Sequence, residues 1–195
     1  ALVSDAGTPL VSDPGYLLVD LAHKEGVRVV PVAGPSSVIA ALSAAGLPTD
    51  RFVFEGFLPA REKARQKKLQ SLSTEMRTVV LFESPHRVPA TVEDLLSIFG
   101  EKRQMTVARE LTKIHEQIVR ADILSIHKMF VAGSIVCRGE FVLVLQGAEK
   151  QQSHLDHMNL LTLLAAEMSP SRAAAVAHKL TGVSRKELYA MLSQI

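Results

Sequence analysis

The sequence contains no tryptophan, only one cysteine and no long uninterrupted apolar run. With a single cysteine, Cys137, the chain cannot form an intramolecular disulfide, and this cysteine usage is typical of a reducing compartment. A membrane-spanning helix needs about 20 consecutive apolar residues, and no segment approaches that length. No charged segment followed by a short apolar core marks a secretory signal peptide. We therefore expect a cytoplasmic protein that has no membrane partner.

The composition is otherwise typical of a globular protein. The chain has 195 residues, of which 47% are hydrophobic and 22% charged, and its formal net charge is only +2. A chain of this length can bury a substantial core, as one large domain or two small ones. The near-balance of charge says little about partners until the positions of the basic residues are considered.

Apolar runs alternate with segments of helical spacing along most of the chain. Predicted strands cover residues 1–3, 27–34, 52–59, 78–84, 104–112 and 139–147. Predicted helices lie at residues 16–26, 34–46, 61–72 and 89–100. This alternation is typical of an α/β sheet. The last part of the chain instead predicts three short helices, at residues 160–168, 169–180 and 185–194, with Ser184 and Glu187 as a capping box.

Two breaks divide the chain. A turn-rich connection at residues 47–51 is followed by a new strand, and residues 148–156 are polar with few apolar side chains. We therefore predict an α/β domain at 1–50, a second α/β domain at 51–150 and a helical, helix-turn-helix-like tail at 151–195. Because the first loop starts only three residues after Ala1, we expect the first domain to be incomplete.

Two loops rich in small and turn-forming residues each precede a predicted helix. The first, SDAGTPLVSDPG, covers residues 4–15, and the second is the GPSS segment that starts at Gly34. Glycine lets the backbone approach a ligand closely, proline holds the loop in shape, and the following helix offers free N–H groups. Two such loops at the carboxyl ends of neighbouring strands would line one ligand crevice. The alternatives are a tight structural turn for the first loop and simple helix capping by Ser36 and Ser37 for the second.

Charged residues gather at the ends of two other predicted strands. FESPHR places Glu83 and Arg87 after one strand, and ARELTK places Arg109, Glu110 and Lys113 after another. Charged groups at strand ends favour a polar site rather than a core. The alternative is structural ion pairing, in which Glu83 neutralises Arg87, or Arg109 neutralises Glu110.

Basic residues are concentrated in one predicted helix and in the tail. These residues are Arg61, Lys63, Arg65, Lys67 and Lys68 in REKARQKK, and Arg185 and Lys186 at the start of the last predicted helix. Contacts to RNA phosphates would use such side chains, and the tail has the layout of a helix-turn-helix. The alternatives are a solvated helix face and a simple three-helix packing domain.

The motifs taken together resemble those of the tetrapyrrole methylase family, and in particular its members that methylate ribosomal RNA. The resemblance is carried by SDAGTPLVSDPG, VVPVAGPSS, GFLP, FESPHR, ARELTK and GEFVLVL, in the same order along the whole chain. It implies two α/β domains that hold S-adenosylmethionine in the cleft between them, usually in a homodimer. It also implies a family segment that would precede the first residue of this sequence. The residues matched to the donor-binding loops of the family are Asp5, Ala6, Gly7, Thr8, Pro9, Ser36 and Ser37.

The reaction that the resemblance implies is 2′-O-methylation of a cytidine ribose in 16S rRNA, with the RNA itself or the small ribosomal subunit as partner. Such a transfer needs the methyl group held in line with the hydroxyl, water excluded and the hydroxyl proton removed, and it requires no metal. Glu83, Glu110 and Lys113 are the candidates to orient or deprotonate the hydroxyl. Two alternatives remain open: methylation of a tetrapyrrole precursor, and a catalytically silent RNA-binding module.

Overall fold

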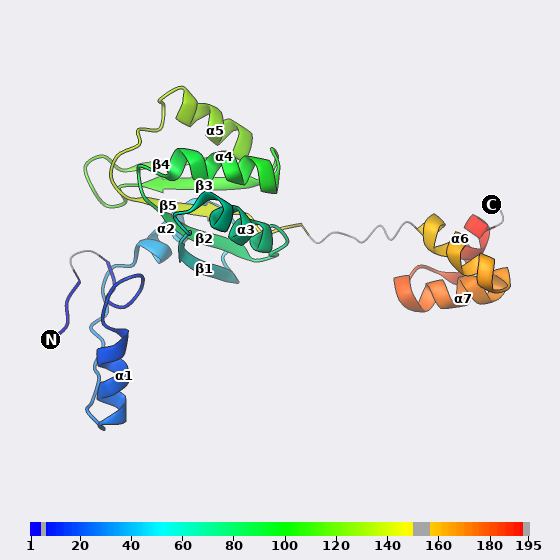
Figure 1. Cartoon of the computed structure of the whole chain (residues 1–195), viewed down its shortest axis with the longest axis horizontal. Coiled ribbons are helices and arrows are strands. Elements are labelled where there is room, and N and C mark those ends of the chain that lie inside the picture. Colours follow the sequence, from blue (N-terminus) through cyan, green and yellow to red (C-terminus); the bar gives the residue numbers. More distant parts are fainter. Residues whose placement is uncertain (5–6, 150–156, 193–195) are drawn as a thin grey trace. The chain divides into compact units, whose positions relative to one another are not determined.

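The chain folds as two compact units, Ala1–Glu149 and Lys150–Ile195 (Figure 1). The computed structural model describes residues 1–4, 7–149 and 157–192, so most of the expected linker at 148–156 lies outside the described residues. The predicted fold class is confirmed, because the first unit contains an α/β sheet and the described part of the second is helical. The domain boundary near residue 50 stays a prediction.

A five-stranded sheet forms the centre of the first unit. Its strands are β1 (Phe52–Phe57), β2 (Thr78–Glu83), β3 (Gln104–Arg109), β4 (Gln117–Asp122) and β5 (Phe141–Leu145). They lie in the order β1-β2-β5-β3-β4, with β1 parallel to β2 and the other neighbouring pairs antiparallel. The central strand β5 is buried along its whole length. Its unbroken apolar sequence suits a strand that is covered on both faces.

Helices cover both faces of this sheet (Figure 1). The helices α3 (Glu62–Leu72), α4 (Val88–Phe99) and α5 (Ile123–Val131) contribute to the larger core, and α2 (Ser37–Ala45) contributes to the smaller one. Successive strand residues point to opposite faces. Val79 and Leu81 therefore join the core with α3, α4 and α5, whereas Val80 joins the core with α2.

The predicted strands at residues 1–3 and 27–34 are wrong, because neither segment is a strand in the structure. A strand is stabilised by hydrogen bonds to a neighbouring strand, and the described sheet consists of β1 to β5 alone. The helix α1 (Tyr16–Lys24) between these segments forms as predicted, but it has no buried residue. Val32, whose apolar character favoured a strand, is 94% exposed. The apolar residues of these two segments therefore led to a wrong strand prediction, because neither segment has a neighbouring strand in the described sheet.

Two elements, β4 and α5, have no counterpart among the sequence predictions. β4 is an edge strand whose residues alternate between exposed and half-buried over most of its length, so its apolar signal is weak. α5 begins after Asp122, whose Oδ1 accepts a hydrogen bond from the Ser125 N–H at 2.7 Å. That backbone hydrogen bond lowers the pKa of Asp122, because it favours the carboxylate over the carboxylic acid.

Replacing Asp122 with Ala is expected to destabilise the first unit and to lower the urea concentration at which it unfolds, because the first turn of α5 loses its cap. The measurement is urea unfolding followed by circular dichroism. Asp50→Ala is the control, since Asp50 is exposed and forms only a 3.7 Å ion pair with exposed Arg51. An equal loss of stability in the two variants would contradict the capping role.

The described part of the second unit consists of α6 (His157–Glu167), α7 (Pro170–Thr181) and α8 (Arg185–Leu192). Its core is formed by Leu161, Ala174, Ala177 and Leu188. The Ser184 hydroxyl accepts from the Glu187 N–H at 3.3 Å, so the predicted cap by Ser184 is present; the Glu187 carboxylate accepts from the Ser184 hydroxyl at 2.8 Å, which is not the bond to the Ser184 N–H that a full capping box has. Among all described helices, none has the length and apolar character needed to cross a membrane.

Candidate active site

The ends of β2 and β3 and the start of β5 meet at one edge of the sheet. Phe141, the first residue of β5, pairs with Glu83 on one side and with Arg109 on the other. Neighbouring strands lie about 4.8 Å apart, so the backbones of Glu83 and Arg109 are roughly 10 Å apart. We call this region, with Glu83, Arg109 and Glu110, the charged edge. FESPHR and ARELTK therefore bring their charged residues to the same edge.

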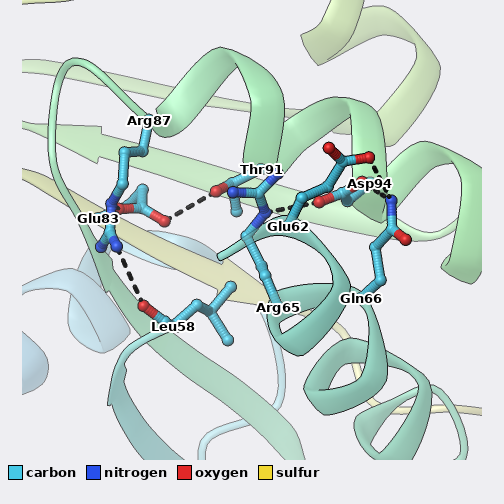
Figure 2. A network of polar contacts seen from close by, with 8 residues as sticks. All are labelled: Leu58, Glu62, Arg65, Gln66, Glu83, Arg87, Thr91 and Asp94. Carbon is cyan, nitrogen blue, oxygen red and sulfur yellow. Dashed lines mark hydrogen bonds and ion pairs between the residues drawn. The ribbon is translucent and has the colours of Figure 1, made fainter. Parts of the chain in front are cut away.

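Glu83 is the most enclosed of the candidate residues, and its side chain is completely buried. One carboxylate oxygen accepts from the Ser84 N–H at 2.7 Å and from Arg87 at 2.7 and 2.8 Å, and the other accepts from the Thr91 hydroxyl at 2.7 Å. Arg87 also donates to the Leu58 carbonyl at 3.2 Å, just beyond β1 (Figure 2). Both oxygens of Glu83 are thus occupied, which favours a role in tying β2 to α4 over contact with a substrate.

Glu110 lies immediately after β3, and its carboxylate is only partly enclosed. Its Oε1 accepts from the Glu140 N–H at 2.9 Å and from the Lys113 ammonium at 3.0 Å. Lys113 donates in addition to the Glu140 carboxylate at 3.1 Å. The alternative in which Arg109 forms an ion pair with Glu110 is not what the structure shows, because the ion-pair partner of Glu110 is Lys113.

These contacts fix the charge state of both groups. The hydrogen bond from the Glu140 N–H and then the one from Lys113 lower the pKa of Glu110. The hydrogen bonds to Glu110 and Glu140 raise the pKa of Lys113. A carboxylate with a lowered pKa stays ionised as the pH falls through its usual range, and an amine with a raised pKa stays protonated. Glu110 therefore stays a carboxylate that can accept a hydrogen bond, and Lys113 is a fixed positive charge beside it.

The two loops that were matched to a donor site lie against each other. The Thr8 hydroxyl donates to the Pro35 carbonyl at 3.0 Å. Gly7 has a φ of 79°, and no described atom lies within 4 Å of the position that a Cβ would take at Gly7 or at Gly34. Pro9 is half-buried in the first loop. Asp5 and Ala6, which belong to the same prediction, lie outside the described residues.

Ser36 and Ser37 lie at the beginning of α2. The Ser36 hydroxyl accepts from the Ile39 N–H at 3.5 Å, so capping by Ser36 is present. At the other end of the helix the Ala45 carbonyl accepts from the Thr106 hydroxyl, and Leu111, next to Glu110, packs against the core that contains α2. In the first loop, the Ser12 hydroxyl lies 3.1 Å from the position that a Cβ would take at Gly56, near the end of β1. Because β1 runs parallel to β2, this loop reaches the end of the sheet where Glu83 lies.

The basic helix α3 presents part of its charge to solvent. Arg61, Lys63 and Lys67 are exposed and form no ion pair with a described residue. Lys63 and Lys67 are one helical turn apart, so they lie on one face. Lys68 is half-buried and pairs with Glu55 at 2.6 Å. Three of the five predicted RNA contacts in this helix are therefore available as surface cations.

Arg65 is the exception, and its assignment to RNA contact is corrected. Its side chain is only 7% exposed, and its Nε lies 2.5 Å from the carboxylate of Asp94 on α4. Gln66 donates to the other oxygen of Asp94 at 2.8 Å (Figure 2). Arg65 lies about half a helical turn from Lys63 and Lys67, so it faces α4 while they face solvent. It anchors the basic helix instead of extending its charged surface.

Arg185 and Lys186 are exposed at the start of α8. The turn before this helix is held by His178, whose Nδ1 lies 2.7 Å from the Val183 carbonyl, and by Gly182 with a φ of 73°. A helix, a tight turn and a second helix with basic residues in its first turn match the layout predicted for the tail.

Other features of the first unit lie away from these residues. A pocket of about 210 Å³ is lined by Pro48, Thr78 and Gln146 among others. Thr78 is the first residue of β2, so the pocket lies at the opposite edge of the sheet from Glu83. Within residues 1–4, 7–149 and 157–192, no group of three or more His, Cys, Asp or Glu side chains is arranged to hold a metal ion.

The sequence reasoning missed Glu140 and Asp94. Glu140 is 30 residues from Glu110 in the chain, and Asp94 is 29 residues from Arg65. No local spacing connects such pairs. For Glu140, the sequence signal was a carboxylate directly before the apolar strand FVLVL. For Asp94, it was a charged residue among apolar helix positions.

The fold and the charged edge define a class of mixed α/β proteins in which turn-rich loops and acidic strand ends share one end of a sheet. The model of the family "Tetrapyrrole (Corrin/Porphyrin) Methylases" matches residues 1–126, and a second model, "RsmI C-terminal HTH domain", matches residues 151–195. The chain belongs to the tetrapyrrole methylase family, and its tail is of the helix-turn-helix type.

Relatives of high similarity span nearly the whole chain. Ribosomal RNA small subunit methyltransferase I of Xylella fastidiosa (strain Temecula1) is 47% identical over 97% of this chain and 70% of that protein. The proteins of the same name from Escherichia coli O157:H7 and a Synechocystis strain are 45% and 44% identical, with 67% and 69% of their lengths covered. This chain therefore spans about two thirds of the relatives that it matches.

Solved structures show the fold. The methyltransferase CobJ has a TM-score of 0.52 at 18% identity, with 73% of this chain and 62% of that chain covered. Cobalt precorrin-4 methyltransferase has a TM-score of 0.51 at 21% identity, with 72% and 61% covered. At such low identities the likeness supports the fold alone, and the substrates of those enzymes are not carried over.

Proposed function

We propose that this chain is an S-adenosylmethionine-dependent methyltransferase of the small-subunit ribosomal RNA, and that it methylates the 2′-hydroxyl of a cytidine in 16S rRNA. The observation that carries the proposal is the similarity over 97% of the chain to relatives of that name. The structure supports it by bringing the two loops and the acidic end of β3 to one end of the sheet.

The loops suit the methyl donor. S-adenosylmethionine supplies an electrophilic methyl group on a positively charged sulfur. The Thr8–Pro35 hydrogen bond joins the loops, and open space beside Gly7 and Gly34 lets a ligand approach their backbones. We propose that Gly7, Thr8, Pro9, Ser36 and Ser37 bind the donor, together with Asp5 and Ala6.

Glu110 and Lys113 suit the acceptor side of the reaction. The ionised Glu110 accepts a hydrogen bond from the ribose hydroxyl, which orients the oxygen and draws the proton away as the methyl group is transferred. The Lys113 ammonium keeps Glu110 ionised and remains close by to balance the charge. Glu83 is buried at the same edge and stabilises it through its hydrogen bonds with Arg87 and Thr91.

The exposed cations of α3 and α8 suit the RNA backbone. We propose that Arg61, Lys63, Lys67, Arg185 and Lys186 contact phosphates, with Lys68 contributing less because it is paired with Glu55. Since the rRNA is assembled in the cytoplasm, we propose that the protein acts there, with 16S rRNA or the small subunit as its partner.

We also propose that the protein is a homodimer, and analytical ultracentrifugation tests this.

Replacing both Lys63 and Lys67 with Ala is expected to weaken RNA binding and to reduce the slope of log K against log salt by roughly 1.5 to 2, because two phosphate contacts are lost. The measurement is a fluorescence titration with a 16S rRNA fragment at several salt concentrations. Lys68→Ala is the matched control on the same helix and should change the slope less. A double variant with the wild-type slope would remove α3 from the RNA interface.

The deciding experiment is methyl transfer from labelled donor to 16S rRNA, both naked and in assembled small subunits, followed by mapping of the modified nucleotide. Transfer to a tetrapyrrole precursor in place of RNA would overturn the proposal, and the family membership makes this the alternative to test. Calorimetry with S-adenosylmethionine separates an enzyme from a silent RNA-binding module, because only the enzyme needs the donor.

A further inference from the structure

The segment before β5 contains Gly139, whose backbone lies against the side chain of Glu110, the candidate catalytic carboxylate. Gly139 has a φ of 82°, and a Cβ built on it would overlap the carboxylate of Glu110. The close approach is possible because glycine has no side chain. The neighbouring Glu140 N–H then reaches Glu110 Oε1 at 2.9 Å.

Glu110 is held in this position by its backbone as well as by its side chain. Its N–H donates to the Glu140 carbonyl at 3.0 Å, and its φ of 51° is unusual for a residue with a side chain. The Glu140 N–H and the Lys113 ammonium both donate to Oε1 of the carboxylate. Oε2 has no hydrogen-bond donor among the described residues, and it is the oxygen left for a substrate hydroxyl.

Arg109 secures the two segments that meet at Glu110. This buried side chain donates to the Arg138 carbonyl at 2.6 Å and to the His115 carbonyl at 3.1 Å. Arg138 directly precedes Gly139, and His115 belongs to the loop that follows Glu110. One guanidinium thus fixes the backbone on both sides of the contact.

We propose that Gly139 is a positioning residue for catalysis: its missing side chain lets the Glu110 carboxylate lie against the backbone, with Oε1 bound to Glu140 and Lys113 and Oε2 presented to the substrate hydroxyl. This inference rests on the proposed function for its link to methyl transfer. The position of the Glu110 carboxylate against Gly139 follows from the contacts of Glu110 and does not depend on the proposed reaction. The charged groups around that carboxylate are Lys113, Glu140 and Arg109.

Gly139→Ala tests the proposal, with Gly133→Ala as the matched control. Gly133 lies in the same connection before β5 and has a φ of 72°, but no described atom lies within 4 Å of its Cβ position. Both variants therefore carry the strain of a side chain at positive φ, and only Gly139→Ala displaces Glu110. The atoms that the new Cβ would displace, Cγ, Cδ and Oε1 of Glu110, all belong to one flexible side chain and none to the backbone, so the variant is expected to fold.

Two readouts on the full chain are compared. In Gly139→Ala, the pKa of Glu110 is expected to rise toward its usual value, because the carboxylate loses its hydrogen-bond donors. The rate of methyl transfer by Gly139→Ala is expected to be roughly 10- to 100-fold lower than the rate of Gly133→Ala, because the carboxylate is displaced. The pKa is measured by carbon-13 NMR titration of labelled glutamate, with Glu110→Gln assigning the signal. Thermal melting checks that the two variants are equally folded.

The outcomes separate this inference from the proposed function. An unchanged Glu110 titration in Gly139→Ala overturns the positioning role, and so does a raised pKa with the methyl-transfer rate of Gly133→Ala. If the wild-type protein transfers no methyl group to rRNA, the proposed function fails, while the titration still decides whether Gly139 positions Glu110.

Discussion

Replacing Glu110 with Gln is expected to abolish methyl transfer to 16S rRNA while leaving the binding of S-adenosylmethionine intact. The amide has nearly the shape of the carboxylate, but it carries no charge and presents an N–H₂ group where one carboxylate oxygen would accept the hydroxyl proton. Loss of a general base typically lowers the rate by about 10² to 10⁴-fold. The rate is measured with labelled donor under single-turnover conditions, and donor binding is measured by calorimetry.

Glu140→Gln is the control for this prediction. Its side chain is 68% exposed and also contacts Lys113, but the hydrogen bond that it gives to Glu110 comes from its backbone N–H. Most activity should therefore remain. An equal loss of methyl transfer and donor binding in Glu110→Gln would instead assign Glu110 to binding or to folding.

The largest effect on stability is expected for Asp94→Ala, at about 3 to 5 kcal/mol, because it leaves the buried Arg65 guanidinium without its counter-charge. The side chains of Arg65 and Asp94 are only 7% and 10% exposed, and Gln66 also loses its acceptor. The measurement is denaturant unfolding of the full chain. The basic face of α3 depends on this anchor, so RNA binding should weaken with the fold.

Two variants calibrate that prediction. Asp20→Ala removes the exposed ion pair with Lys24 and should cost about 1 kcal/mol or less. The double variant Arg65→Met with Asp94→Leu removes both buried charges and should recover most of the loss, because no uncompensated charge remains. If Asp94→Ala were no more destabilising than Asp20→Ala, the pair would not anchor α3.

Much of the site could be predicted as positions along the chain, but not as contacts. Glu110 and Lys113 were identified at a strand end, yet the nearest charged neighbour in sequence, Arg109, was one suggested partner of Glu110. In the structure Arg109 bonds to backbone carbonyls and Lys113 forms the ion pair. For Glu83 the suggested partner Arg87 was right, because the two are four residues apart across one tight turn.

The sequence by itself determined the fold class, β5 as a covered strand, the helix-turn-helix-like tail and Ser184 as the cap of α8. These features depend on local spacing and on apolar runs, which act within a few residues. Only the tertiary structure decided that residues 27–34 form no strand, that Arg65 faces Asp94 instead of solvent, and that Gly139 lies beneath Glu110. Each of these features depends on which distant segment of the chain packs against the residue. Hydrogen bonds and buried ion pairs between segments about 30 residues apart produce no periodic pattern in the sequence, so the sequence does not predict them.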